Sequence, residues 1–112
     1  MSLVDSLGSP SALTCPECQG VLWEIHDDAL TRYRCHTGHG FGPAALAEGK
    51  AEELEVALWT ALRALKEKAE LARRIGARAL ASGGDREIGR AEDQIEFMER
   101  QMTVLQKLIE KL

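Results

Sequence analysis

The sequence predicts a mainly α-helical chain with one small β element: a compact ribbon followed by an antiparallel hairpin of two helices. Residues 12–42 contain all three cysteines and all three histidines, and a segment this short rarely folds without a staple such as a metal. Residues 43–112 are rich in Ala, Leu, Glu, Lys and Arg, which are good helix formers. That helical pattern is broken once, at Ser82-Gly83-Gly84. Residues 1–11 are expected to be a flexible lead-in.

A metal site is predicted by Cys15-Pro16-Glu17-Cys18 together with Cys35-His36-Thr37-Gly38-His39. Two cysteines three positions apart form a knuckle, and a third thiol with one imidazole completes a tetrahedral donor set that favours zinc. We therefore expect residues 12–42 to form a zinc ribbon. The expected ligands are Cys15, Cys18, Cys35 and His39. His36 is the alternative fourth ligand, although adjacent residues usually point apart, and His26 or a water molecule are further alternatives.

The strands of this ribbon are expected within residues 20–36, with a polar turn near His26-Asp27-Asp28-Ala29. The alternation predicts that Val21, Trp23 and Ile25 share one face. We expect Trp23, Tyr33 and Phe41 to form a small core beside the metal, with a recognition surface as the alternative. Gly20 and Gly38 are expected to supply the positive φ angles of the two knuckles.

The first helix is expected over about 44–81, where Pro43 suits the first helical turn. Its apolar spacing predicts one seam, interrupted at Lys68, that contains Leu54, Leu58, Ala61, Leu65, Ala72, Ile75 and Ala79.

The second helix is expected over about 86–112, with Asp85 as its N-cap. The spacing between its apolar residues alternates between three and four positions without interruption. This pattern is a heptad seam. These residues are Ile88, Ala91, Ile95, Met98, Met102, Leu105, Ile109 and Leu112. A three-residue break between the two helices favours an antiparallel hairpin.

A second apolar stripe lies beside these seams and is wider than a two-helix contact needs. It contains Val56, Trp59, Leu62, Phe97, Val104 and Leu108. We expect the stripe to pack on another helix pair or on the zinc ribbon. A homodimer that forms a four-helix bundle would cover it, so we expect a homodimer.

Several function classes are disfavoured by the composition. The net charge is −4 and basic residues form no patch, so nucleic-acid binding is not expected. No apolar run reaches the length of a membrane span, and the first 13 residues lack a signal-peptide pattern. Reduced metal-binding thiols suit the cytoplasm.

Enzymatic activity is not expected either. The chain contains no catalytic serine motif, phosphate loop or His-Glu-x-x-His sequence. Glu17 could act as a proton shuttle in an open zinc site, but four protein ligands would close the site. We therefore expect neither catalytic residues nor a small-molecule substrate, and an enzyme remains the third hypothesis.

Three runs of sequence resemble a known family: TCPECQGVLWE (14–24), YRCHTGHGF (33–41) and EVALWTALRALKE (55–67). Together they are similar to the C-terminal zinc-ribbon and helical extension of some chemotaxis-type protein-glutamate methylesterases. The catalytic domain of that family is absent here, so the resemblance carries over no catalytic residue. It implies a binding or assembly role in bacterial signalling.

The sequence thus predicts a non-catalytic, zinc-binding module for protein interaction or oligomerisation in chemotaxis-type signal transduction. The alternative is a zinc-ribbon and coiled-coil factor that binds the transcription machinery. That alternative would require acidic residues at the hairpin tip, where Asp85 is available.

Overall fold

A computed structural model describes residues 8–112, which form four strands and two helices. The chain divides into two compact units, one that ends at Leu54 and one that begins at Glu55. The mainly helical fold, with a small antiparallel sheet and a packed hairpin, is as predicted. The first unit extends beyond the predicted ribbon 12–42, because the start of the first helix packs within it.

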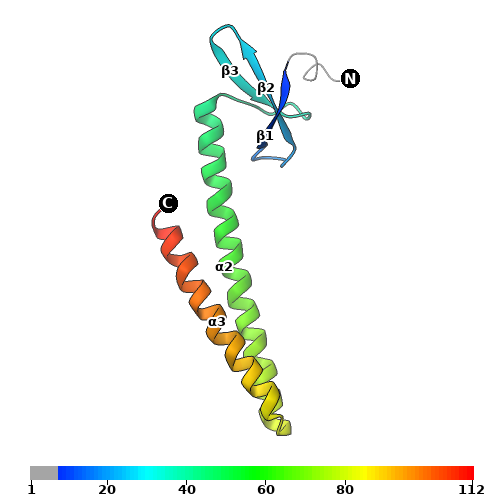
Figure 1. Cartoon of the computed structure of the whole chain (residues 1–112), viewed down its shortest axis with the longest axis vertical. Coiled ribbons are helices and arrows are strands. Elements are labelled where there is room, and N and C mark those ends of the chain that lie inside the picture. The colour runs from blue at the N-terminus through cyan, green and yellow to red at the C-terminus, as the bar shows by residue number, and fades with distance from the viewer. Residues whose placement is uncertain (1–7) are drawn as a thin grey trace. The chain divides into compact units, whose positions relative to one another are not determined.

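The sheet is antiparallel and its strands follow the order of the sequence (Figure 1). Its strands are β1 (Ser9–Thr14), β2 (Val21–Asp27), β3 (Leu30–Arg34) and β4 (Gly40–Phe41). Asp27 pairs with Leu30 across a two-residue turn, and Asp28 adopts a φ of 55° there. Asp is among the few residues other than glycine that tolerate this conformation.

The predicted lead-in over residues 1–11 is wrong for its last part. Residues 9–11 belong to β1, in which Ser9 pairs with Glu24 and Pro10 with Trp23. The Ser11 hydroxyl also donates a hydrogen bond of 2.8 Å to the Leu22 carbonyl. Residues 1–7 lie outside the described part of the chain.

The core of the first unit lies on the face of β2 opposite to that of Val21, Trp23 and Ile25. Leu22 is fully buried with Cys15 and Cys35, and Tyr33 and Phe41 pack against this cluster. The prediction of a small core beside the metal thus holds for Tyr33 and Phe41. It is wrong for Trp23, because residues 22 and 23 of a strand point to opposite faces.

The first turns of α2 (Pro43–Ser82) complete this unit. Leu46 is 5% exposed and belongs to the same core cluster. Gly49 approaches Pro16 so closely that an added Cβ would lie 2.9 Å from the Pro16 Cγ. Lys50 donates a hydrogen bond of 2.9 Å to the Thr14 hydroxyl. The absence of a side chain at Gly49 permits this close approach.

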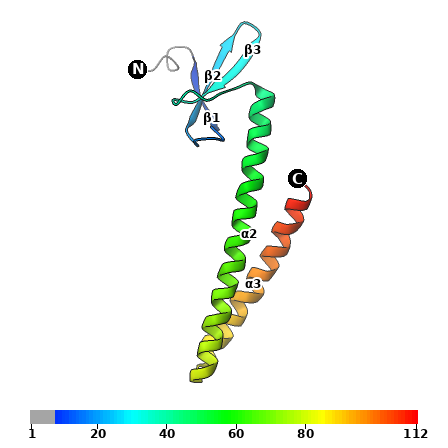
Figure 2. The same ribbon diagram turned by 180° about the vertical axis from the view of Figure 1, so that it is seen from behind.

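The second unit is an antiparallel hairpin formed by the remainder of α2 and by α3 (Asp85–Glu110). In both views the two helices lie closest near the connecting turn and diverge toward the end of α3 (Figures 1 and 2). Small residues explain the close approach: a Cβ added to Gly76 would lie 3.2 Å from the Ala91 Cβ. The centre of the seam is the buried cluster of Ala69, Ala72 and Met98.

The seam on α3 follows the predicted heptads, except that Leu112 is 56% exposed. The predicted seam on α2 is partly wrong. Leu54 and Ile75 are 48% and 59% exposed, and Ala61 is exposed as well. The residues of α2 that are buried or half-buried in the hairpin are Leu58, Leu62, Leu65, Ala69, Ala72, Gly76 and Ala79.

In this corrected seam the spacing between successive residues alternates between four and three positions throughout. The seam therefore has no interruption at Lys68, which is exposed. Leu62 therefore belongs to the seam and not to the second stripe, and it is 2% exposed. The prediction failed because Ala69 and Gly76 are too small to stand out in an apolar pattern. Their size is the reason that the helices can approach each other there.

The start of α3 also differs from the prediction. Gly84 is the N-cap, with no side-chain cap hydrogen bond, and Asp85 is the first helical residue. A carboxylate in the first turn still interacts favourably with the positive end of the helix dipole. Within residues 8–112, neither helix has an apolar stretch long enough to cross a membrane.

Candidate metal centre

The first knuckle connects β1 to β2. The Cys15 carbonyl accepts a hydrogen bond of 2.8 Å from the Gln19 N–H, and the Cys15 N–H donates one of 2.7 Å to the Gly20 carbonyl. Gln19, with a φ of 62°, occupies the left-handed conformation that was predicted for Gly20. A Cβ at Gly20 would lie 3.4 Å from the Cys18 Sγ, which is an ordinary van der Waals contact.

The second knuckle connects β3 to β4. The Cys35 N–H donates to the His39 carbonyl at 3.1 Å, and the Gly38 N–H donates to the Cys35 carbonyl at 3.2 Å. Gly38 has a φ of 98°, as predicted, which closes the turn. The His39 N–H lies 3.3 Å from the Cys35 Sγ and donates to it.

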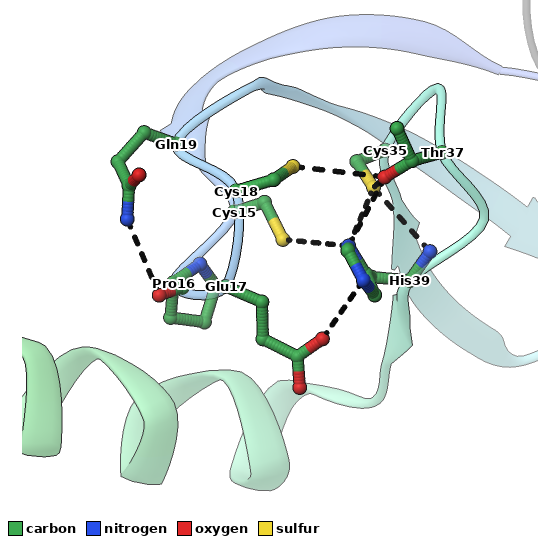
Figure 3. Close-up of polar contacts among 8 residues, drawn as sticks. All are labelled: Cys15, Pro16, Glu17, Cys18, Gln19, Cys35, Thr37 and His39. Atoms are coloured by element: carbon green, nitrogen blue, oxygen red, sulfur yellow. Dashed lines mark hydrogen bonds and ion pairs between the residues drawn. The ribbon is translucent and has the colours of Figure 1, made fainter.

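Together the knuckles bring four candidate ligand atoms to one place (Figure 3). The three thiols and the His39 imidazole all lie within 4.8 Å of one another, from the residues Cys15, Cys18, Cys35 and His39. The His39 Nδ1 lies 3.6 Å from the Cys15 Sγ and 3.2 Å from the Cys35 Sγ. Bonds of about 2.0–2.3 Å to a tetrahedral zinc imply ligand atoms about 3.5–3.8 Å apart. The donor set suits a metal ion and is compatible with zinc, although the shorter of the two distances, 3.2 Å, lies below this range.

The orientation of His39 is fixed from its other side. Its Nδ1 faces the thiols, while its Nε2 lies 3.0 Å from a Glu17 carboxylate oxygen (Figure 3). A carboxylate that accepts a hydrogen bond from one ring nitrogen leaves the other nitrogen free to bind a metal. Glu17, considered above as a proton shuttle, thus lies behind the imidazole and not beside an open coordination position.

Thr37 is a contributor that sequence reasoning missed. Its hydroxyl lies 3.0 Å from the Cys35 Sγ and 3.1 Å from the His39 Nδ1, and it donates to the Cys18 Sγ at 3.7 Å. A hydroxyl at this place can donate a hydrogen bond to a thiolate. Its position in the sequence, between the two expected ligands Cys35 and His39, could have indicated this role.

The electrostatics favour thiolates in two of the three cysteines. Burial opposes ionisation of Cys35, but hydrogen bonds from Thr37 and from the His39 N–H prevail and lower its pKa to about 6. The pKa of Cys18 is lowered by the Gly20 N–H and by His39. Burial raises the pKa of Cys15. The nearby thiols of Cys18 and Cys35 raise the pKa of His39.

The two other histidines lie elsewhere. The ring of His36 packs edge-on against Trp23, with ring centroids 4.3 Å apart. His26 lies near the β2–β3 turn, 3.2 Å from the Thr31 hydroxyl. Neither belongs to the group of potential ligands.

The chain was compared with protein-family models, with curated protein sequences and with solved structures, and none of the three comparisons gave a match. The chemistry of the site therefore rests on its geometry.

Proposed function

We propose that this chain is a non-catalytic zinc-binding module that mediates protein interaction in bacterial signal transduction of the chemotaxis type, in the cytoplasm. The observation that carries the proposal is the complete donor set of Cys15, Cys18, Cys35 and His39. Three thiolates and one imidazole fill the four positions of tetrahedral zinc, and closed sites of this kind are structural. When bound, the metal would supply folding energy to a sheet with a very small core.

Two observations support a role without catalysis. A catalytic zinc keeps one position for water or substrate, whereas four protein ligands leave none. The Glu17 carboxylate, which could have served as a proton shuttle, contacts the His39 Nε2 at 3.0 Å. We therefore assign the zinc the task of holding the knuckles together.

The zinc assignment is tested by elemental analysis of protein purified without added metal. We expect close to one zinc per chain, and a Cys18→Ser variant that loses it. The variant should retain the helical circular dichroism signal of the hairpin, because the hairpin seam lies in the other compact unit. A folded sheet without any bound metal would contradict the assignment.

The interaction role is supported by the apolar side chains that the hairpin leaves exposed. Phe97, Val104 and Leu108 of α3 are between 44% and 59% exposed, and clustered apolar surface usually marks an interface. The setting in chemotaxis-type signalling is supported by the sequence resemblance described above.

The rival function is binding to the transcription machinery. It can be distinguished from the proposed function by identifying the proteins that co-purify with the tagged chain from its source organism. The proposal expects chemotaxis-type signalling proteins or the chain itself. Enrichment of RNA polymerase subunits, reduced by a charge reversal at Asp85, would favour the rival. Asp85 lies at the start of α3, beside the hairpin turn.

A further inference from the structure

The two flanks of the hairpin differ in chemistry. On one flank Arg73 of α2 donates a hydrogen bond of 3.2 Å to Glu99 of α3 across the seam. Trp59 and Lys66 lie at 7-residue steps from Arg73, so they share its side of α2. A groove on this flank is lined by Trp59, Leu62, Lys66, Gln106, Ile109 and Glu110. We call this side the polar flank.

The opposite side, the apolar flank, carries large apolar residues on both helices. Leu71 and Ile75 of α2 are 58% and 59% exposed, and Phe97, Val104 and Leu108 of α3 are 54%, 59% and 44% exposed. Helical periodicity places exposed Ala57, Ala61 and Ala64 on the same side of α2. Among the described side chains of this flank none is acidic. The apolar flank consists of Ala57, Ala61, Ala64, Leu71, Ile75, Phe97, Val104 and Leu108, with the polar residues Lys68 and Gln101 among them.

The predicted second stripe therefore joined two different surfaces. Val56 and Trp59 belong to the side of α2 that contains Lys66 and Arg73, whereas Phe97 and Val104 belong to the apolar flank. One contact surface cannot cover both sides of a hairpin. A single interface must use one of the two flanks, and the apolar flank exposes more apolar side-chain surface.

We propose that the apolar flank binds a second copy of this chain, with the two hairpins parallel and related by a twofold axis along their length. This inference rests on the proposed interaction role of the hairpin. In such a pair, α2 of one copy lies against α3 of its partner at the same height along the hairpin. The contact of Gly76 with Ala91 fixes which residues share a height.

Two of the resulting pairs are complementary in size, while the same register places Arg78 opposite the partner's Arg90 at the turn end of the flank. Ala64 lies opposite the partner's Val104, and Leu71 lies opposite the partner's Phe97. Small residues opposite large ones allow close packing. The one cation in the middle of the flank, Lys68, lies opposite the partner's Gln101, whose amide oxygen can accept its hydrogen bond. A twofold contact requires a surface that is complementary to itself in this way.

The area of this contact can be estimated from the exposed side chains. Five large side chains about half exposed each contribute on the order of 100 Å², and the three alanines add to this. Counting both copies, the buried surface is on the order of 1,000–1,400 Å², which reaches the lower range of specific interfaces.

Two valines provide a matched test. Val104 on the apolar flank is 59% exposed and Val56 on the other side is 66% exposed, and both lie inside helices. By sedimentation equilibrium we expect a wild-type dimer at tens of micromolar, a Val104→Glu chain whose dissociation constant is at least tenfold higher, and a Val56→Glu chain that dimerises as the wild type does.

A charge exchange tests the register with substitutions that replace one polar side chain by another. Gln101→Lys should weaken the dimer by placing two cations opposite each other, and adding Lys68→Glu should restore it. Zinc content and helical circular dichroism are measured on every variant, so that loss of the metal site can be distinguished from loss of dimerisation. A monomeric wild type, equal effects of the two valine variants, or no restoration by the exchange would overturn the proposal. A monomeric wild type would indicate that the flank binds a different protein.

Discussion

Replacement of Gly49 by alanine should destabilise the first unit, although alanine is the better helix former. The reason is the contact between α2 and the first knuckle. A Cβ at position 49 would lie 2.9 Å from the Cγ and 3.4 Å from the Cβ of Pro16, whereas carbon atoms prefer about 3.5–4.0 Å. The proline ring is rigid, so α2 or the knuckle has to move.

The expected magnitude follows from two opposing terms. Alanine should stabilise the helix by about 1 kcal/mol relative to glycine, while overpacking typically costs about 1–3 kcal/mol. The net change for Gly49→Ala is thus about 0–2 kcal/mol of destabilisation. Gly89 of α3 is the matched control, because a Cβ there would meet nothing within 4 Å. Gly89→Ala should be stabilising by about 1 kcal/mol.

The assay is urea denaturation of the zinc-loaded protein in a Trp59→Phe background, so that Trp23 fluorescence reports on the sheet for Gly49→Ala and helical circular dichroism reports on the hairpin for Gly89→Ala. Pro16→Ala removes the Cγ that would clash, and in its presence Gly49→Ala should no longer cost stability. Stabilisation by Gly49→Ala equal to that by Gly89→Ala would refute this reasoning. So would a cost that persists in the Pro16→Ala background, since the double-mutant cycle assigns the coupling to the proline ring.

Three further outcomes are expected. Glu17→Gln should weaken zinc binding by about 10–100-fold in a chelator competition, with His39→Ala weaker still; unchanged affinity would mean that the carboxylate does not orient the imidazole. His36→Ala should leave zinc affinity unchanged and alter only the environment of Trp23, and a loss of zinc would reinstate it as a ligand. Met98→Ala should cost the hairpin about 2–5 kcal/mol, measured by thermal denaturation, because Met98 is 3% exposed in the seam; a neutral effect would mean that the helices do not pack there.

The candidate ligands could be chosen from the sequence because metal chemistry depends on residue type and spacing. The pairs Cys15/Cys18 and Cys35/His39 predict two knuckles before any fold is known, and the structure brings their side chains together. The role of Glu17 could not be predicted in the same way. Its position depends on the direction of the His39 ring, which follows from how the second knuckle meets the first.

The seam of α3 was predictable because its large apolar residues repeat every 3–4 positions. The seam of α2 was not, because at Ala69 and Gly76 the packing selects small side chains, and hydrophobicity gives little signal for them.

Periodicity and ligand spacing are local properties of the chain, and they were enough to specify the helical hairpin, the antiparallel ribbon and the four candidate metal ligands. Three features could be known only from the folded chain: which face of β2 is buried, why Gly49 lies against Pro16, and how the exposed apolar residues divide between two flanks. These features depend on the distance and rotation between packed elements. Those quantities are set by the side chains of both partners in each contact, so neither segment specifies them alone.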